Sequence, residues 1–398
     1  YALRWVGGEP GTAAYLASLS VDRAQNWTQF RQAVARWKTP SENMVYADVD
    51  GHIGWIAAAL SPVRENYDGL LPVPGAAGKY RWNGFLPLDE LPQVHDPASG
   101  YVLTANHNIL PTGYRRAIAY DWSEPYRFLR LNERFAGQPK LTLRDFQQMQ
   151  LDRGSILAQQ LVEVLRQAVA SDPAAFEHAD WLAAWDGVLD RDSQAAAIYT
   201  LWRLELTKRF FHRCPEKLFD EVARRASLAA MVEQLQQPTR AWFGDNPQQQ
   251  RDRLVCEAYA AALTQAEEKM GAARADWTLG RLQNVLFKHP LAGLSAAHAE
   301  ALNVGPYPSG SDPFAPDQAR FDRNFSRVHG PTYRQVFDLA DWDQGLATSA
   351  PGQSGQPGSP HYADLAPLWD RGEYFPLAFS RAKVEAVARH RLKLMPAR

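Results

Sequence analysis

The sequence predicts an α+β protein, and three regions carry that prediction. Apolar runs on both sides of Asp50-Gly51 indicate a β-hairpin near the N-terminus. Between residues 141 and 271, apolar side chains recur every three or four positions, which indicates helices. Loops and short strands follow. We therefore expect a β-rich segment at 1–140, a mainly helical lobe at 141–272 and a C-terminal segment at 273–398 that returns to the β-rich part.

Composition excludes several classes of partner. The 398 residues are 45% hydrophobic and 22% charged, which is enough apolar surface for a large core. The formal net charge is -1, so we expect neither nucleic acid nor an acidic membrane as a partner. The longest apolar run, at 53–60, is far shorter than the ~18 residues of a membrane span. Cys214 and Cys256 have no metal-ligand spacing, and a pair of buried thiols is favoured over a disulfide.

The N-terminal elements are expected in the following order. Residues 12–38 hold two helices, the second of which starts after Asp22. The hairpin pairs residues 45–50 with 52–59 across the Asp50-Gly51 turn. Residues 60–100 are rich in Pro and Gly and are expected to form a long irregular excursion. A strand at 101–105 then ends at Asn106.

The rest of the chain is first helical and then mixed. Further helices fit residues 195–211, 216–236 and 249–270. Strands are expected within 326–339, a loop of Gly, Pro and Ser at 351–360, and a strand or helix at 375–394. The chain shows no internal repeat of solenoid length.

Asn106 and Arg127 are the candidate catalytic residues. Asn106 lies in a cluster of carboxamides, and an Asn amide is a neutral donor that can hold the negative oxygen of an acyl-transfer intermediate. Arg127 follows in Trp122-Ser123-Glu124-Pro125-Tyr126-Arg127 and is a permanent cation. Together they suggest part of an amide-hydrolysing site whose nucleophile lies elsewhere.

Several blocks, taken in order, point to a known family. They are Asn43-Met44-Val45-Tyr46-Ala47-Asp48-Val49-Asp50-Gly51-His52-Ile53-Gly54, Leu71-Pro72-Val73-Pro74-Gly75, Trp82-Asn83-Gly84-Phe85-Leu86-Pro87, Ser99 to Asn106, Trp122 to Arg127, His289-Pro290-Leu291, Gly352-Gln353-Ser354-Gly355-Gln356 and Ser359-Pro360-His361-Tyr362. With these blocks the chain resembles the penicillin acylase family of N-terminal-nucleophile hydrolases. It is similar to most of the large subunit without its N-terminal portion.

The resemblance implies a four-layer αββα sandwich with an inserted helical lobe. It also implies a precursor that cleaves itself and exposes a Ser, whose hydroxyl attacks and whose own α-amino group is the base. By motif, Asn106 matches the oxyanion Asn, and Arg127 matches the Arg near the amino group of the nucleophile. The nucleophilic Ser would lie upstream of Tyr1, so this chain alone should be inactive.

Partners, location and metal follow from the same resemblance. The substrate would be an N-acyl amine, a β-lactam with an acyl side chain, or an N-acyl homoserine lactone. The upstream part of the large subunit and the small subunit of the same precursor would be the protein partners, in the periplasm or outside a bacterial cell. Catalysis needs no cofactor. Family members often hold a structural calcium ion. Near the expected position after Asn106 the sequence has Arg115 and Arg116 rather than a carboxylate, and Asp121 is the remaining candidate ligand. Ser18 and Leu19 are expected near the start of the second helix and near the acyl pocket.

Other readings compete with this one. The chain could be a non-catalytic structural or ligand-binding fragment. Ser354, His361 and Asp364 could be imagined as a triad, but they crowd one loop, and the sequence around Ser354 is no nucleophile elbow. A Gly-rich packing loop is favoured there. Packing or supporting roles are also favoured for three other polar residues: Asn43, His107 and His289.

Overall fold

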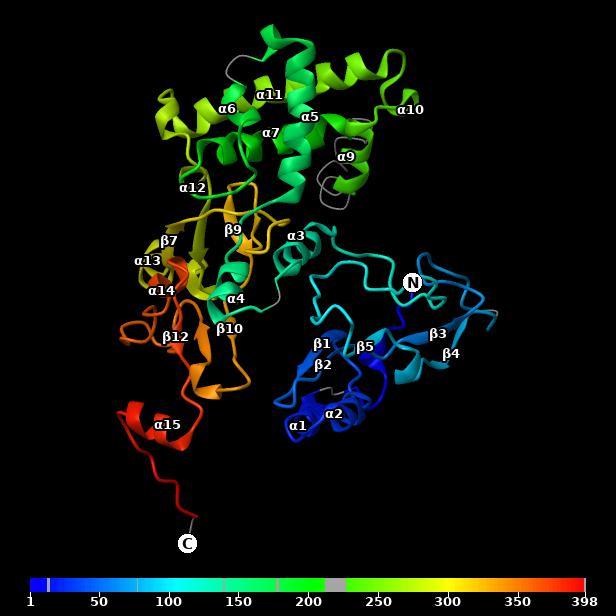
Figure 1. Ribbon diagram of the computed structural model, residues 1–398, viewed down its shortest axis with the longest axis vertical. Helices are drawn as coiled ribbons and strands as arrows, with labels where there is room; N and C mark the ends of the chain where they lie inside the picture. Colours follow the sequence, from blue (N-terminus) through cyan, green and yellow to red (C-terminus); the bar gives the residue numbers. More distant parts are fainter. Residues whose placement is uncertain (13–14, 77, 139, 177–178, 212–226, 397–398) are drawn as a thin grey trace. The chain divides into compact units, whose positions relative to one another are not determined.

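The computed structural model describes the chain except residues 13–14, 77, 139, 177–178, 212–226 and 397–398 (Figure 1). Its contacts divide it into two compact units, Tyr1–Phe128 and Leu129–Arg398, and each is described by itself. Helix α3 (Tyr126–Phe135) begins at the end of the first unit. No helix among the described residues is both long and apolar enough to span a bilayer.

The first unit combines two short helices with small antiparallel sheets. Its elements are η1 (Val6–Gly8), α1 (Tyr15–Val21), α2 (Trp27–Val34), β1 (Glu42–Ala47), β2 (Ile53–Ala58), β3 (Pro62–Glu65), β4 (Arg81–Phe85), η2 (Leu88–Glu90) and β5 (Gln93–His95). One sheet has the order β1-β2-β5, and β3 pairs with β4 in another. The predicted hairpin is therefore confirmed, with Glu42 opposite Ala58 and Ala47 opposite Ile53.

The turn of this hairpin is built from Asp48, Asp50 and Gly51. The carboxylate of Asp48 accepts from the backbone amides of Asp50 at 3.1 Å and His52 at 2.9 Å. Gly51 has φ +91, a left-handed conformation that costs glycine little and other residues more. A turn that ends in a left-handed residue matches the twist of the two strands, which explains why this short loop closes the pair.

Helix α2 covers the sheet through a small core. Phe30 and Val34 on α2 are buried against Tyr46, Ile56 and Ala58 of the hairpin. Strand β2 is buried along nearly its whole length, because α2 covers one face and its neighbours flank both edges. This packing fixes the start of β2 and the end of β5, where two histidines lie.

The second unit starts with a group of helices. They are α4 (Leu143–Gln150), α5 (Ile156–Ser171), η3 (Pro173–Ala175), α6 (Asp180–Ala183), α7 (Gln194–Phe210), α9 (Leu228–Gln236), α10 (Arg240–Phe243) and α11 (Pro247–Met270). Helix α7 lies among its neighbours (Figure 1) and is buried on all sides along residues 195–202, whereas its second half exposes Leu204 and Lys208. Ser155 and Ser193 cap α5 and α7 by accepting from the third backbone amide of each helix.

Short strands and further helices complete the second unit. They are η4 (Arg274–Asp276), α12 (Leu279–Leu282), β6 (Asn284–Phe287), η5 (Pro290–Leu294), α13 (Ala296–Leu302), β7 (Val304–Pro308), β8 (Arg320–Phe321), β9 (Ser326–His329), β10 (Arg334–Val336), η6 (Trp342–Gln344), β11 (Leu346–Thr348), α14 (Ala366–Asp370), β12 (Phe375–Pro376) and α15 (Arg381–Val387). The sheet orders are β7-β6-β9-β8 and β10-β11-β12. Only the β6–β9 pair among them is parallel in the part of the chain described here.

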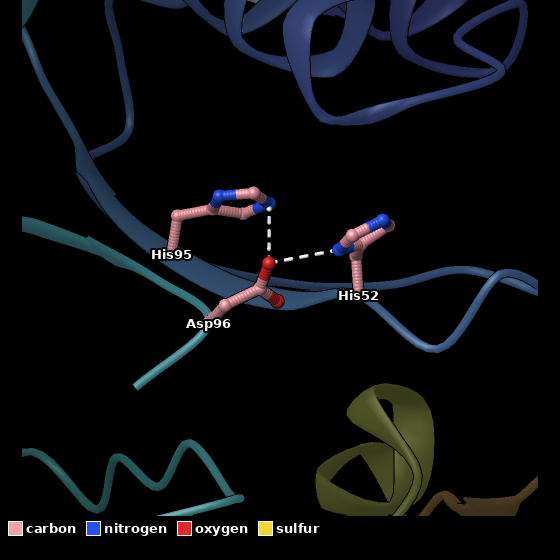
Figure 2. A group of neighbouring side chains, drawn as sticks. All are labelled: His52, His95 and Asp96. Carbon is pink, nitrogen blue, oxygen red and sulfur yellow. Dashed lines mark hydrogen bonds and ion pairs between the residues drawn. The ribbon is translucent and has the colours of Figure 1, made fainter. Parts of the chain in front are cut away.

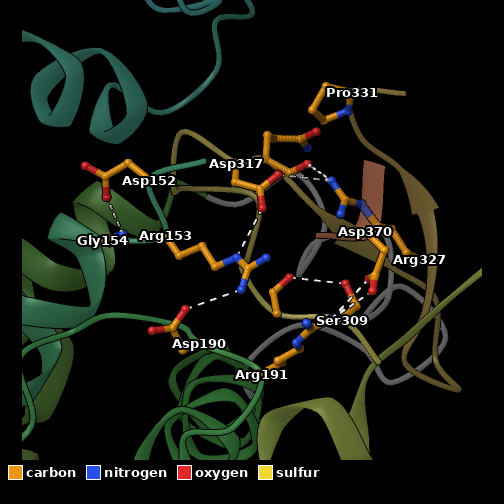
Figure 3. A network of polar contacts seen from close by, with 12 residues as sticks. Asp152, Arg153, Gly154, Asp190, Arg191, Ser309, Asp317, Arg327, Pro331 and Asp370 are labelled. Carbon is orange, nitrogen blue, oxygen red and sulfur yellow. Dashed lines mark hydrogen bonds and ion pairs between the residues drawn. The ribbon is translucent and has the colours of Figure 1, made fainter. Parts of the chain in front are cut away.

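A buried ionic network ties the helices of this unit to its strands (Figure 3). The carboxylate of Asp317 accepts from Arg334 Nη2 at 3.0 Å and from Arg153 Nε at 3.2 Å. Arg327 Nη2 lies 3.7 Å from the same carboxylate. Asp317 and Arg334 are both buried, so these charges depend on one another rather than on water.

Four local predictions need correction. Residues 101–105 belong to no described strand, because β propensity forms a strand only where a partner is present. Residues 60–100 are not one irregular excursion, since β3, β4 and β5 lie within them. The cap of α2 is Asn26 and not Asp22, because the Asn26 side chain accepts from Gln29 N. Ser18 and Leu19 lie in α1 rather than near the start of the second helix.

The predicted helices of the second unit are largely confirmed. Helices α7 and α11 match the expected ranges 195–211 and 249–270 to within two residues at each end. Helix α9 matches the end of the range 216–236, whose first part lies outside the described residues. Cys214 also lies outside them, while Cys256 is half-buried on α11.

Candidate functional site

Asn106 lies in an unusual backbone conformation. Its φ is +62, in the left-handed region, where Asn is among the few non-glycine residues found with any frequency. Its carbonyl oxygen accepts from Ser123 N at 2.9 Å, which joins the two segments that carry the candidate residues. The neighbouring Ala105 is buried, whereas Asn106 is exposed. The side chain is therefore presented on a fixed loop with its amide accessible.

Arg127 orients the carboxamide of Asn106. Arg127 is the second residue of α3, and its Nη2 donates to Asn106 Oδ1 at 2.9 Å. A guanidinium has donors only, so the atom that it contacts must be the amide oxygen. Within the described residues the Nδ2 group has no acceptor, which leaves its two N–H bonds available to an incoming oxygen.

Arg127 remains a cation although it is half-buried. Burial lowers its pKa from the usual range, but an arginine starts so high that it keeps its proton near neutral pH. His107, next to Asn106, behaves differently. Burial, and then the charge of Arg127, lower the pKa of His107, so this imidazole is neutral near pH 7. Its ring stacks on Phe128 with 3.8 Å between centroids, which fits the predicted packing role.

The other polar candidates make structural contacts. Asn43 Oδ1 accepts from Trp55 Nε1 at 3.0 Å across the hairpin. His289 Nδ1 accepts from Leu291 N at 3.1 Å at the start of η5. These bonds fit the supporting roles that the sequence favoured.

The loop around Ser354 does not assemble a triad among the described residues. Ser354 Oγ accepts from Gln356 N at 3.1 Å, and Ser354 N donates to His361 O at 2.9 Å. His361 Nδ1 contacts Asp364 at 2.9 Å, but among the described residues no hydrogen bond joins the His361 ring to the hydroxyl of Ser354. Gly352 lies against the backbone of this segment, where a Cβ would approach His361 O to 2.4 Å. These contacts support the packing-loop interpretation.

Calcium remains a prediction. In the described part of the chain, the side chains that converge closely enough to hold an ion are His52, His95 and Asp96, and Asp121 is not among them. Arg116 instead pairs with Glu90 at 2.6 Å. A hard cation prefers six or more oxygen ligands, so Asp121 alone does not fit such an ion. The His52, His95 and Asp96 group had no sequence signal, because strand pairing alone brings its members together.

Comparison with known proteins decides the family. A model described as penicillin amidase matches residues 1–386. The chain belongs to the penicillin amidase family. It is 29% identical to the acyl-homoserine lactone acylase QuiP of Pseudomonas aeruginosa, over 95% of this chain and 49% of that protein. It is also 29% identical to the penicillin acylase 2 proenzyme of a Pseudomonas species, over 94% and 49% respectively. The 398-residue chain thus spans about half the length of these two relatives.

A solved structure shows the fold. A thermostable penicillin G acylase from Alcaligenes faecalis superposes with a TM-score of 0.68 and 20% identity. The match covers 97% of this chain and 73% of the Alcaligenes faecalis chain. The predicted α+β fold of the penicillin acylase family is therefore confirmed. The roles of Asn106 and Arg127, and the division at residues 140 and 272, stay predictions.

Proposed function

We propose that this chain works in an enzyme that hydrolyses the linear amide bond of N-acyl compounds of penicillin or acyl-homoserine lactone type. Asn106 supplies the side-chain donor for the oxyanion, and Arg127 holds that donor in place. The contact between Arg127 Nη2 and Asn106 Oδ1, at 2.9 Å, is the observation that supports this proposal most directly. It fixes the orientation of an exposed amide before any substrate arrives.

We assign the attacking hydroxyl to an N-terminal Ser outside these 398 residues, on the upstream part of the same precursor. Its α-amino group accepts the hydroxyl proton as the oxygen adds to the substrate carbonyl. The negative oxygen that forms accepts from Asn106 Nδ2. Collapse of the intermediate expels the amine with the transferred proton and leaves an acyl ester, which water then hydrolyses to release the acid. The chain alone is inactive in this scheme.

Arg127 has a second role in the proposal. A nearby positive charge disfavours protonation of the Ser amine and keeps it a base near neutral pH. Its unperturbed pKa of roughly 7.7 to 8.0 already lies close to that range. A neutral His107 adds no further charge. We also propose self-cleavage of the precursor, a small subunit as partner, and a periplasmic or secreted location, all by relation to the family.

The test uses the complete precursor that contains this chain. Asn106→Asp keeps an oxygen for Arg127 and tolerates the left-handed backbone, but it removes the amide donor. We expect kcat/KM on a panel of aryl and fatty N-acyl amides, penicillins and acyl-homoserine lactones to fall by ~10²–10³ or more. Asn106→Gly removes the donor without adding charge, and a loss of similar size is expected.

Asn66→Asp is the matched control, because Asn66 is also exposed and also left-handed, with φ 64. It should retain the activity of the unmodified enzyme. Near-normal turnover in both Asn106 variants would refute the oxyanion role. A precursor that neither cleaves itself nor releases acid from any member of the panel would favour the non-catalytic reading instead.

A further inference from the structure

Three metal-ligating side chains meet at the hairpin of the first unit. His52 directly precedes β2, His95 ends β5, and Asp96 follows it. Antiparallel pairing of β2 with β5 places Gly54 opposite His95, which brings residues more than forty positions apart to one sheet end. One ligand atom from each of the three side chains lies within 4.8 Å of the others (Figure 2).

The distances suit a transition-metal ion. His52 Nδ1 lies 2.8 Å and His95 Nε2 3.5 Å from Asp96 Oδ2. Ligand atoms bound tetrahedrally at about 2.0–2.2 Å are separated by about 3.3–3.6 Å. The His95–Asp96 pair already lies at such a separation, whereas the His52–Asp96 pair, which is hydrogen-bonded, is shorter and has to open. The ligand nitrogens of the two histidines lie within 4.8 Å of one another. Both imidazoles are partly exposed, so small rotations of these rings can bring their nitrogens inward.

The backbone and a neighbouring ring hold the ligands in place. Asp96 has φ +46, and its Oδ1 accepts from Ile53 N at 3.0 Å, which leaves Oδ2 directed between the two rings. The ring of His95 stacks on Trp27, with 4.7 Å between centroids and 15° between planes. Two of the three ligands are thus oriented by contacts that an ion would not have to break.

We propose that His52, His95 and Asp96 bind a divalent transition-metal ion such as zinc. Two imidazoles and one carboxylate form a donor set that suits zinc, nickel, cobalt or iron rather than calcium or magnesium. The bound ion links the start of β2 to the end of β5 and leaves its remaining positions to water. It therefore stabilises the hairpin sheet, and its binding is independent of the amide hydrolysis proposed above.

The test measures zinc binding by the full chain, prepared without a polyhistidine tag. Calorimetric titration should show one zinc ion per chain, and excess calcium or magnesium should not compete. Zinc should raise the thermal midpoint, and a chelator should reverse the rise. Cobalt should bind at the same site and give visible absorption bands that report imidazole ligation directly.

Three variants each remove one ligand and keep its structural contact. His52→Gln changes an exposed side chain, His95→Phe retains a ring to stack on Trp27, and Asp96→Asn retains the acceptor for the Ile53 amide. Each should lower zinc affinity by at least about ten-fold, since even residues that only support metal ligands have effects of that size. Circular dichroism verifies that each variant is folded.

His361→Gln is the matched control. His361 is an exposed histidine that pairs with a carboxylate, Asp364, at 2.9 Å, but it has no third ligand in the described residues. Its replacement should leave zinc affinity and the cobalt spectrum unchanged. The proposal is overturned if the unmodified chain binds no zinc, or if the three folded ligand variants bind it as tightly as the unmodified chain.

Discussion

Removing the charge of Asp317 should strongly destabilise the second unit. This carboxylate is 3% exposed and lies within 3.0–3.7 Å of guanidinium nitrogens from Arg334, Arg153 and Arg327. Asp317→Asn keeps the size of the side chain but leaves three arginines without their shared anion. Breaking a buried ion pair typically costs about 3–5 kcal/mol, because the remaining charge stays buried. We expect a loss of unfolding free energy in that range.

Asp190 offers a control within the same network (Figure 3). Arg153 also donates to Asp190, at 3.3 Å, but the Asp190 side chain is 63% exposed. Water replaces the lost partner there, so Asp190→Asn should cost no more than about 1 kcal/mol. The two substitutions are chemically identical and share one arginine. Their difference therefore measures the combined effect of burial and of the two additional arginines, Arg327 and Arg334, around Asp317.

Urea denaturation at neutral pH, followed by far-ultraviolet circular dichroism, measures both variants against the unmodified chain. The helices of the second unit dominate that signal, so its transition reports the relevant unit. A free energy of unfolding for Asp317→Asn within about 1 kcal/mol of that of the unmodified chain would contradict this prediction. Equal destabilisation of the two variants would contradict it as well, because burial and the additional arginines would then not determine the cost.

Two further predictions concern the same unit. Gly352→Ala should lower the free energy of unfolding by about 1–3 kcal/mol in urea denaturation, because its Cβ would lie 2.4 Å from His361 O. The control Gly355→Ala should leave this free energy unchanged, because its Cβ would meet no atom within 4 Å. Burial raises the pKa of Asp312, so its contribution to stability is full below the unfolded value of about 3.9 and is lost as the pH rises through the higher folded pKa. Asp312→Asn should therefore gain stability relative to the unmodified chain as the pH rises above the unfolded value of about 3.9, and parallel curves of stability against pH would contradict this.

Local signals in the sequence were sufficient for elements that local chemistry determines. The Asp50-Gly51 turn and the apolar recurrence of α7 and α11 each depend on residues close in sequence, and all three were predicted. The residues at 101–105 favour a strand but have no partner strand in the described structure, so β propensity alone gave a wrong prediction there. The start of α2 was placed after Asp22 because Asp and Asn are equally good N-cap residues, so the sequence alone did not distinguish Asp22 from Asn26.

The two candidate sites also differ in how far the sequence could predict them. Asn106 and Arg127 could be singled out because each lies in a recognisable block, but their contact at 2.9 Å could not be read from a separation of 21 residues. The meeting of His52 with Asp96 depends on the register of β2 against β5, and β5 itself was not predicted. A cluster that depends on a missed strand cannot be found before the strand is known.

In the proposed mechanism, the orientation of the Asn106 carboxamide matters more than its capacity to form hydrogen bonds. A carboxamide can rotate to present either its oxygen or its nitrogen, and only the nitrogen can stabilise an anion. Arg127, held on a helix, donates only to the oxygen, so in the proposed mechanism it selects the orientation that presents the Asn106 nitrogen to the substrate. The left-handed backbone of Asn106 then sets where the amide starts. In the proposed mechanism both constraints exist before substrate binds, so the donor needs no reorganisation as charge develops, which is what makes such donors effective. Asp at position 106 would satisfy both constraints and still present no donor, so its effect on turnover isolates the amide from the scaffold that holds it.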